Sequence, residues 1–124
     1  MMKSIPVWKQ ELSDGVHAAR LASLYCCSPA ETASEAARYT AVLDGLEKTF
    51  GSHAEAGLYS APGRTEIGGN HTDHNNGVVL AGSVNLDMVA VVSPNEENVI
   101  RVKSLGFDKI DDVDVTNLVP QPRE

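Results

Sequence analysis

Residues 61–77 read APGRTEIGGNHTDHNNG, and they stand between two short apolar segments, AGLYSA at 56–61 and LDMVAVV at 86–92. Both apolar segments predict strands, and the second predicts a well-buried one because its apolar run is nearly continuous. The stretch between them holds four glycines and eight Arg, Glu, His, Asp or Asn side chains. It therefore predicts a loop from Pro62 to Gly77. Polar side chains on a glycine-rich loop between strands are the usual construction of a binding site.

The sequence before this stretch has the pattern of helices. Residues Trp8–Tyr25 carry a loose helical stripe that one glycine weakens. The next helix, predicted over Ser28–Phe50, is better specified. Ser28 and Glu31 form an S-x-x-E capping box around a proline at the first helical position. Gly51 follows as the expected stop.

The sequence after residue 77 has the pattern of strands joined by turns. Val99–Lys103 alternates apolar and basic side chains, which predicts a half-exposed strand and, across the turn at 95–98, a hairpin with 86–92. The acidic segment Asp111–Asp114 predicts a loop or an edge strand, and the tail at 119–124 has no periodicity. Helices first and strands afterwards predict the α+β class, with a mostly antiparallel sheet.

Length and composition exclude several classes of protein. The 124 residues suit one small domain, and the net charge of −7 gives no general attraction for nucleic acid or anionic lipid. No apolar run approaches the roughly 20 residues that span a bilayer, and Met1–Trp8 lacks the apolar core of a secretion signal. Two adjacent cysteines, Cys26 and Cys27, form no disulfide framework. We therefore expect a cytoplasmic protein without nucleic-acid or membrane partners.

The polar residues of the 61–77 stretch suit a polyol such as a sugar. The carboxylate of Asp73 can accept hydrogen bonds from two neighbouring hydroxyls, and His71 can donate or accept. Arg64 adds a permanent charge and five N–H donors, which suit an anion or a developing negative charge. The ordinary alternative is a solvated loop, because the Asn and Gly residues at 75–77 are turn formers.

A metal site is a further alternative, since His71-Thr72-Asp73-His74 offers three ligands in four positions. The segment resembles the second half of the HxHxDH motif of dinuclear metallo-hydrolases. The first histidine of that motif would fall at Gly69, and the other two histidines of the chain, His17 and His53, lie in its first half. A zinc site would need further ligands from elsewhere, so we assign no metal ligands here.

Ten of the 17 positions of residues 61–77 are similar to the galactokinase signature APGRVNLIGEHTDYNGG. They are Ala61–Arg64, Gly69, His71–Asp73, Asn75 and Gly77. Galactokinases are members of the GHMP kinases, and the resemblance extends over roughly residues 43–103. It implies a ribosomal protein S5 domain 2-like fold, in which residues 43–124 form part of the sugar-binding N-terminal domain. Residues 1–42 would then be a helical N-terminal extension.

The resemblance implies ATP-dependent phosphorylation of the anomeric hydroxyl of galactose, with ATP and magnesium as cofactors of the parent enzyme. Arg64 would lie near that hydroxyl as the catalytic residue, and His71 and Asp73 would hydrogen-bond the sugar ring. Two substrate-binding positions depart from the pattern, because Glu66 replaces the family's Asn and Asn70 replaces its Glu. Glu66 would then restore the carboxylate that Asn70 lacks, and the identity of the sugar stays open.

The second family motif, a phosphate loop of the type PxxxGLSSSA, does not occur between residues 78 and 124. The third glycine-rich motif and the catalytic aspartate are also missing. We therefore expect a piece of a longer enzyme, truncated before the phosphate loop and inactive alone, with no cofactor-binding residues of its own. Its unpaired strand edges would allow a homodimer. The alternative from another class is a stand-alone sugar-binding or regulatory module.

Overall fold

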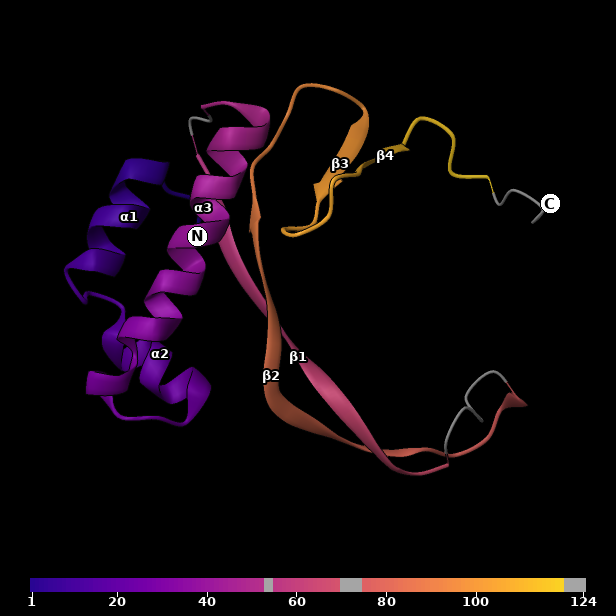
Figure 1. The fold of residues 1–124 in the computed structure, drawn as a ribbon. Helices are drawn as coiled ribbons and strands as arrows, with labels where there is room; N and C mark the ends of the chain where they lie inside the picture. The colour runs from indigo at the N-terminus through magenta and orange to yellow at the C-terminus, as the bar shows by residue number, and fades with distance from the viewer. Residues whose placement is uncertain (53–54, 70–74, 120–124) are drawn as a thin grey trace.

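A computed structural model describes residues 1–52, 55–69 and 75–119. Within these residues the chain forms three α-helices followed by four strands (Figure 1). The elements are α1 (Ile5–Ser13), α2 (Ala18–Tyr25), α3 (Ala33–Phe50), β1 (Gly57–Gly68), β2 (Leu80–Val92), β3 (Val99–Lys103) and β4 (Ile110–Asp114). Figure 1 shows the helices gathered at one end of a long β1–β2 ribbon that bends away from them. The α+β prediction is confirmed.

The helical stripe predicted over Trp8–Tyr25 is divided between two helices. The chain leaves α1 at Asp14 and turns at Gly15, which adopts a φ of +71°. Such left-handed backbone costs little for glycine and more for other residues. The chain then enters α2, whose final turn ends at Cys26 in the left-handed conformation.

The helix predicted from Ser28 begins later, at Ala33, and this correction has a local cause. The Glu31 carboxylate accepts hydrogen bonds from the backbone N–H and the hydroxyl of Ser28, at 2.8 and 2.7 Å. This capping box closes a separate 3₁₀ turn at Pro29–Glu31 instead of the first turn of α3. The predicted C-terminal stop is confirmed, because α3 ends directly before Gly51, where φ is +83°.

The loop predicted over Pro62–Gly77 is wrong for its first part, because β1 continues to Gly68. The reason is non-local: β2 pairs with it in antiparallel register from Gly57↔Val92 to Gly68↔Leu80. Irregularities between Pro62 and Arg64 and between Glu66 and Gly68 absorb the proline and glycines without ending the strand.

The hairpin predicted between 86–92 and Val99–Lys103 is also wrong. The strand at 99–103 has the predicted bounds, but it pairs with β4, from Val99↔Asp114 to Lys103↔Ile110. The chain turns away from β2 after Ser93, and the Asn95 amide donates to the Val99 carbonyl at 3.0 Å. Of the two alternatives predicted for 111–114, a loop or an edge strand, the structure shows the strand.

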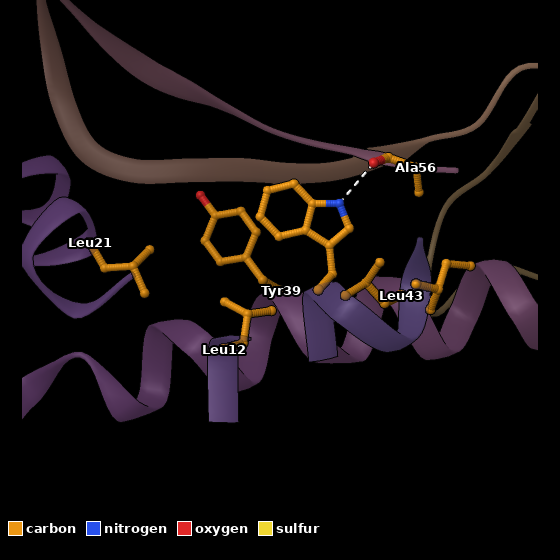
Figure 2. Packing of buried hydrophobic residues seen from close by; sticks show 7 residues of the cluster. Leu12, Leu21, Tyr39, Leu43 and Ala56 are labelled. Atoms are coloured by element: carbon orange, nitrogen blue, oxygen red, sulfur yellow. Dashed lines mark hydrogen bonds between the residues drawn. The ribbon is translucent and has the colours of Figure 1, made fainter. Parts of the chain in front are cut away.

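The buried core joins the helices to the base of the ribbon. The buried apolar side chains are Ile5, Trp8, Leu12, Leu21, Tyr39, Leu43 and Ala56. The Trp8 indole N–H donates to the Ala56 carbonyl at 2.8 Å, and this hydrogen bond is the dashed line in Figure 2. The boundary expected between residues 42 and 43 falls inside α3. The division into an extension and a family domain stays a prediction.

The prediction of a well-buried strand at 86–92 is wrong, because the strand is partly buried on one face and exposed on the other. Val89 and Val91 pack against the core, whereas Leu86 and Met88 are exposed, Met88 to 76%. Side chains alternate between the two faces of a strand, and the helices cover one of these faces. Among the described residues nothing covers the other.

Candidate functional site

Strand β1 places two predicted site residues on one face of the ribbon. Arg64 and Glu66 are two positions apart, so their side chains leave the same side of the strand. An Nη2 N–H of Arg64 donates to Oε1 of Glu66 at 3.3 Å. The arginine side chain is 71% exposed and the glutamate side chain 22% exposed. An exposed pair of this kind is weakly bound, so both groups can turn to a ligand.

A bulge beside Gly63 interrupts the pairing directly before Arg64. Pro62 pairs with Asp87 and Arg64 pairs with Ser83, so β2 passes three residues, 84–86, where β1 passes one. A Cβ at position 63 would lie 3.1 Å from the Leu86 carbonyl oxygen. The close approach therefore favours glycine, and bulges bend a strand and re-aim its side chains. The ribbon bends along its length in Figure 1.

The far end of the ribbon also depends on a glycine. Gly69 has a φ of +78°, and a Cβ there would lie 2.2 Å from the Val78 carbonyl oxygen. No side chain fits such an approach, so this position of the signature requires glycine on steric grounds.

The remaining predicted site residues lie outside the described residues. They are Asn70, His71 and Asp73, together with His74 of the metal alternative. Their roles stay predictions. Among residues 1–52, 55–69 and 75–119 no group of three or more His, Cys, Asp or Glu could hold a metal ion.

A partly buried polar cluster, which the sequence analysis missed, lies at the base of the ribbon. Asp87 of β2 is 5% exposed, and its Oδ1 accepts from Nη2 of Arg38 at 2.6 Å. Its Oδ2 accepts from the hydroxyls of Tyr25 and Ser60, each at 2.6 Å. The Tyr25 and Tyr39 hydroxyls are 3.0 Å apart. We call these five residues the Asp87 cluster. Its one sequence signal was a charged residue inside the apolar run 86–92.

The Asp87 cluster holds an ionised carboxylate. Burial disfavours the charge, but the hydrogen bonds from Ser60, Tyr25 and Arg38 outweigh it and lower the pKa of Asp87. Burial and the hydrogen bond to Asp87 raise the pKa of Tyr25 well above its ordinary value. The Asp87 hydrogen bond likewise raises the pKa of Arg38. Both carboxylate oxygens accept hydrogen bonds from protein donors, so the side chain of Asp87 is held in one position.

The two cavities described between the helices are separate from Arg64 and Glu66. One of about 230 Å³ lies among α1, α2 and α3, and one of about 480 Å³ lies between α1 and α3. Their lining is mainly small and apolar, and no residue of β1 contributes to either. In the described part of the chain, no helix has the length and apolar character needed to cross a membrane.

Comparison with known proteins gives a consistent result. The family model described as "Galactokinase galactose-binding signature" matches residues 46–94. A galactokinase of Lacticaseibacillus casei (strain BL23) is 38% identical over 76 residues, which are 61% of this chain and 19% of that protein. A galactokinase of Glaesserella parasuis serovar 5 is 30% identical over 79 residues, 64% of this chain and 20% of that protein. No solved structure matches the chain.

The chain spans about a fifth of the length of these curated relatives. The matched segment runs from the end of α3 through β2, so it includes Arg64, Glu66 and both close-approach glycines of the ribbon. Residues 46–94 therefore carry the galactokinase galactose-binding signature, and these comparisons support an N-terminal galactokinase fragment.

Proposed function

We propose that this chain is the sugar-binding part of a galactokinase-type kinase, which phosphorylates the anomeric hydroxyl of galactose with ATP. The observation that carries the proposal is the signature match over 46–94, within which Arg64 is exposed beside Glu66 on one face of β1. An exposed guanidinium next to a carboxylate offers donors and acceptors together, which is what a ring of hydroxyls requires.

Arg64 is the proposed catalytic residue. Phosphoryl transfer depends mostly on positioning and on stabilisation of charge, and a guanidinium beside the reacting hydroxyl supplies both. Glu66, whose carboxylate lies 3.3 Å from the guanidinium, would accept hydrogen bonds from sugar hydroxyls. It would thereby replace the carboxylate that the family pattern has at position 70.

Asn70, His71 and Asp73 are the other proposed substrate-binding residues. The Asp73 carboxylate would accept from two adjacent hydroxyls, and His71 would donate or accept according to its tautomer. The Asn70 amide would accept from one hydroxyl more weakly than a carboxylate does. This weaker acceptor and the shifted charge at Glu66 are the reasons to test several hexoses.

ATP and magnesium would be cofactors of the parent enzyme, but the residues of this chain do not fit them. The sequence holds no phosphate loop of the PxxxGLSSSA type, and among the described residues no group of three or more His, Cys, Asp or Glu side chains could hold a metal ion. We therefore derive no step through the nucleotide. The 124-residue chain should bind sugar without turning it over.

Calorimetry with galactose and glucose tests the sugar-binding proposal. The wild-type chain should bind galactose, and Arg64→Ala should weaken binding at least about tenfold, because a hydrogen bond to a charged group contributes about 1.5–3 kcal/mol. Arg101→Ala is the matched control, since Arg101 is a half-exposed arginine of β3, paired with Glu97 and outside the signature region. A folded chain that gives no heat with galactose would contradict the proposal.

A coupled assay with ATP and galactose tests the expected lack of turnover. Formation of sugar phosphate by the purified chain would show that the chain is catalytic by itself. The proposed fragment should bind galactose only weakly, because it is part of a site. Binding as tight as micromolar without nucleotide would instead favour the stand-alone sugar-binding or regulatory module. Transition metal found by elemental analysis would favour the hydrolase alternative built on His71, Asp73 and His74.

A further inference from the structure

We propose that the Asp87 cluster is a positioning device that fixes the bulge at Gly63 and thereby aims Arg64. The inference rests on the proposed function, in which Arg64 faces the sugar. It assigns a role to Asp87, whose side chain is 5% exposed, and to Tyr39, which is buried in the core, so neither side chain is open to a sugar.

The first argument is the place of the cluster on the ribbon. Asp87 and its partner Pro62 form the last regular pair before the bulge, and Arg64 forms the first pair beyond it. The same carboxylate holds both strands, because it belongs to β2 and accepts from Ser60 of β1 at 2.6 Å. A displacement of the backbone at the Pro62–Asp87 pair would therefore displace Arg64 as well.

The second argument is that the cluster ties the ribbon to the helices. Tyr25 donates from the last residue of α2. Arg38 donates from α3, to the carboxylate at 2.6 Å and to the Asp87 carbonyl at 3.3 Å. Arg38 is itself held by Glu35 of the same helix at 2.6 Å. The base of the ribbon is therefore fixed to α2 and α3 by directional bonds.

The third argument concerns the register of β2. A slip of one residue would turn every side chain to the opposite face. Leu86 or Met88 would then enter the cluster, and the Asp87 carboxylate would leave behind its three donors, Arg38, Tyr25 and Ser60. Buried donors without a partner are costly, so the cluster selects one register. The apolar neighbours Val89 and Val91 tolerate small shifts, because apolar contacts are not directional.

A purely stabilising role explains a buried charge poorly. Buried ion pairs often contribute no more stability than apolar residues of the same size, whereas removal of one partner is strongly destabilising. The cluster also lies beside the bulge and not at the centre of the core formed around Leu43 and Trp8. Its directional bonds therefore serve alignment.

The experiment uses the 124-residue chain with three substitutions that remove or restore single groups. Ser60→Ala removes the hydroxyl that links β1 to Asp87, Ser60→Thr retains a hydroxyl, and Asp87→Asn removes the charge. The matched control is Asp44→Asn, which breaks an ion pair of 2.6 Å between α1 and α3 without touching the ribbon. Circular dichroism verifies folding, and Tyr25→Phe replaces Asp87→Asn if that variant is unfolded.

Galactose calorimetry and amide hydrogen exchange are the two readouts. Ser60→Ala and Asp87→Asn should weaken binding about tenfold or more, because displacement of a catalytic group by about 1 Å has effects of this size or greater. Ser60→Thr should restore binding, and Asp44→Asn should leave it within about twofold. Amide exchange at residues 64–66 should become faster in Ser60→Ala and Asp87→Asn. Amide exchange in α3 should stay unchanged in both variants.

The two readouts separate failure of this inference from failure of the proposed function. If the wild-type chain binds no galactose, the proposed function fails, and exchange at residues 64–66 alone decides the inference. If the wild type binds and Ser60→Ala binds equally well with unchanged exchange, the positioning role is refuted. Equal quickening in α3 and at residues 64–66 would assign the cluster to general stability and would refute the proposal too.

Discussion

Leu43 is the residue whose truncation should most clearly test the described core. Its side chain on α3 is fully buried and lies in the cluster that α1 and the base of β1 complete. Leu43→Ala removes three carbon groups, whose transfer from water contributes about 2.5 kcal/mol at about 0.8 kcal/mol for each group. The cavity left behind adds to this, so we expect a loss of about 3–4 kcal/mol in the free energy of unfolding.

Urea unfolding followed by the fluorescence of Trp8 measures this loss directly, because Trp8 is the single tryptophan and lies in the same cluster. The midpoint should fall while the slope with urea stays unchanged. Leu24→Ala is the matched control, since Leu24 is also helical but 52% exposed. Its effect should be about 0.5 kcal/mol or less. If an unfolded Leu43→Ala chain prevents the measurement, Leu43→Val supplies a smaller loss of the same sign.

A loss below about 1.5 kcal/mol for Leu43→Ala, or one equal to that of Leu24→Ala, would refute the reasoning. It would mean that α3 does not pack on α1 and on the base of the ribbon as described.

Three further predictions concern the ribbon. Gly69→Ala should destabilise the chain more than Gly15→Ala in urea unfolding. Both glycines have a positive φ, but only at position 69 would a Cβ also collide with a carbonyl oxygen, that of Val78. Equal losses in the free energy of unfolding would contradict the close approach. The lowered pKa of Asp87 should stabilise the fold above the ordinary carboxyl pKa of about 3.9, and this contribution should be lost as the pH falls further. Urea unfolding between pH 7 and pH 2.5 measures the free energy of unfolding, and this free energy should fall less with pH in Asp87→Asn than in the wild type. The two-stranded β1–β2 ribbon has unpaired edges among the described residues, so sedimentation should detect a dimer at high concentration; a monomer throughout would contradict the edge-pairing proposal.

Local signals in the sequence predicted part of this fold correctly. Gly51 ends α3 because glycine accepts the left-handed backbone at a helix end. The alternation at Val99–Lys103 predicted β3 with its observed bounds. The signature residues at 61–77 led to the family that the comparisons also found. Each of these inferences uses residues within a few positions of one another, where side-chain chemistry and backbone preference act directly.

The residues of the candidate site were proposed from the sequence, whereas the strand that carries Arg64 and Glu66 was not predicted. Arg64 and Glu66 were chosen from the signature, and the structure adds that they share one face of a strand, not a loop. No local pattern shows that Pro62–Gly68 pairs with β2, because a glycine-rich segment looks the same in a loop and in a bulged strand.

The sequence by itself therefore determined the α+β class, the ends of several elements and the polar residues offered to a ligand. The tertiary structure alone decided which strands pair and where the charge of Asp87 is neutralised. Tyr25 and Asp87 are 62 positions apart in the chain, and Arg38 and Asp87 are 49 apart. Contacts of this span depend on the packing of whole helices against the ribbon, and packing is decided by shape and burial that no short segment encodes.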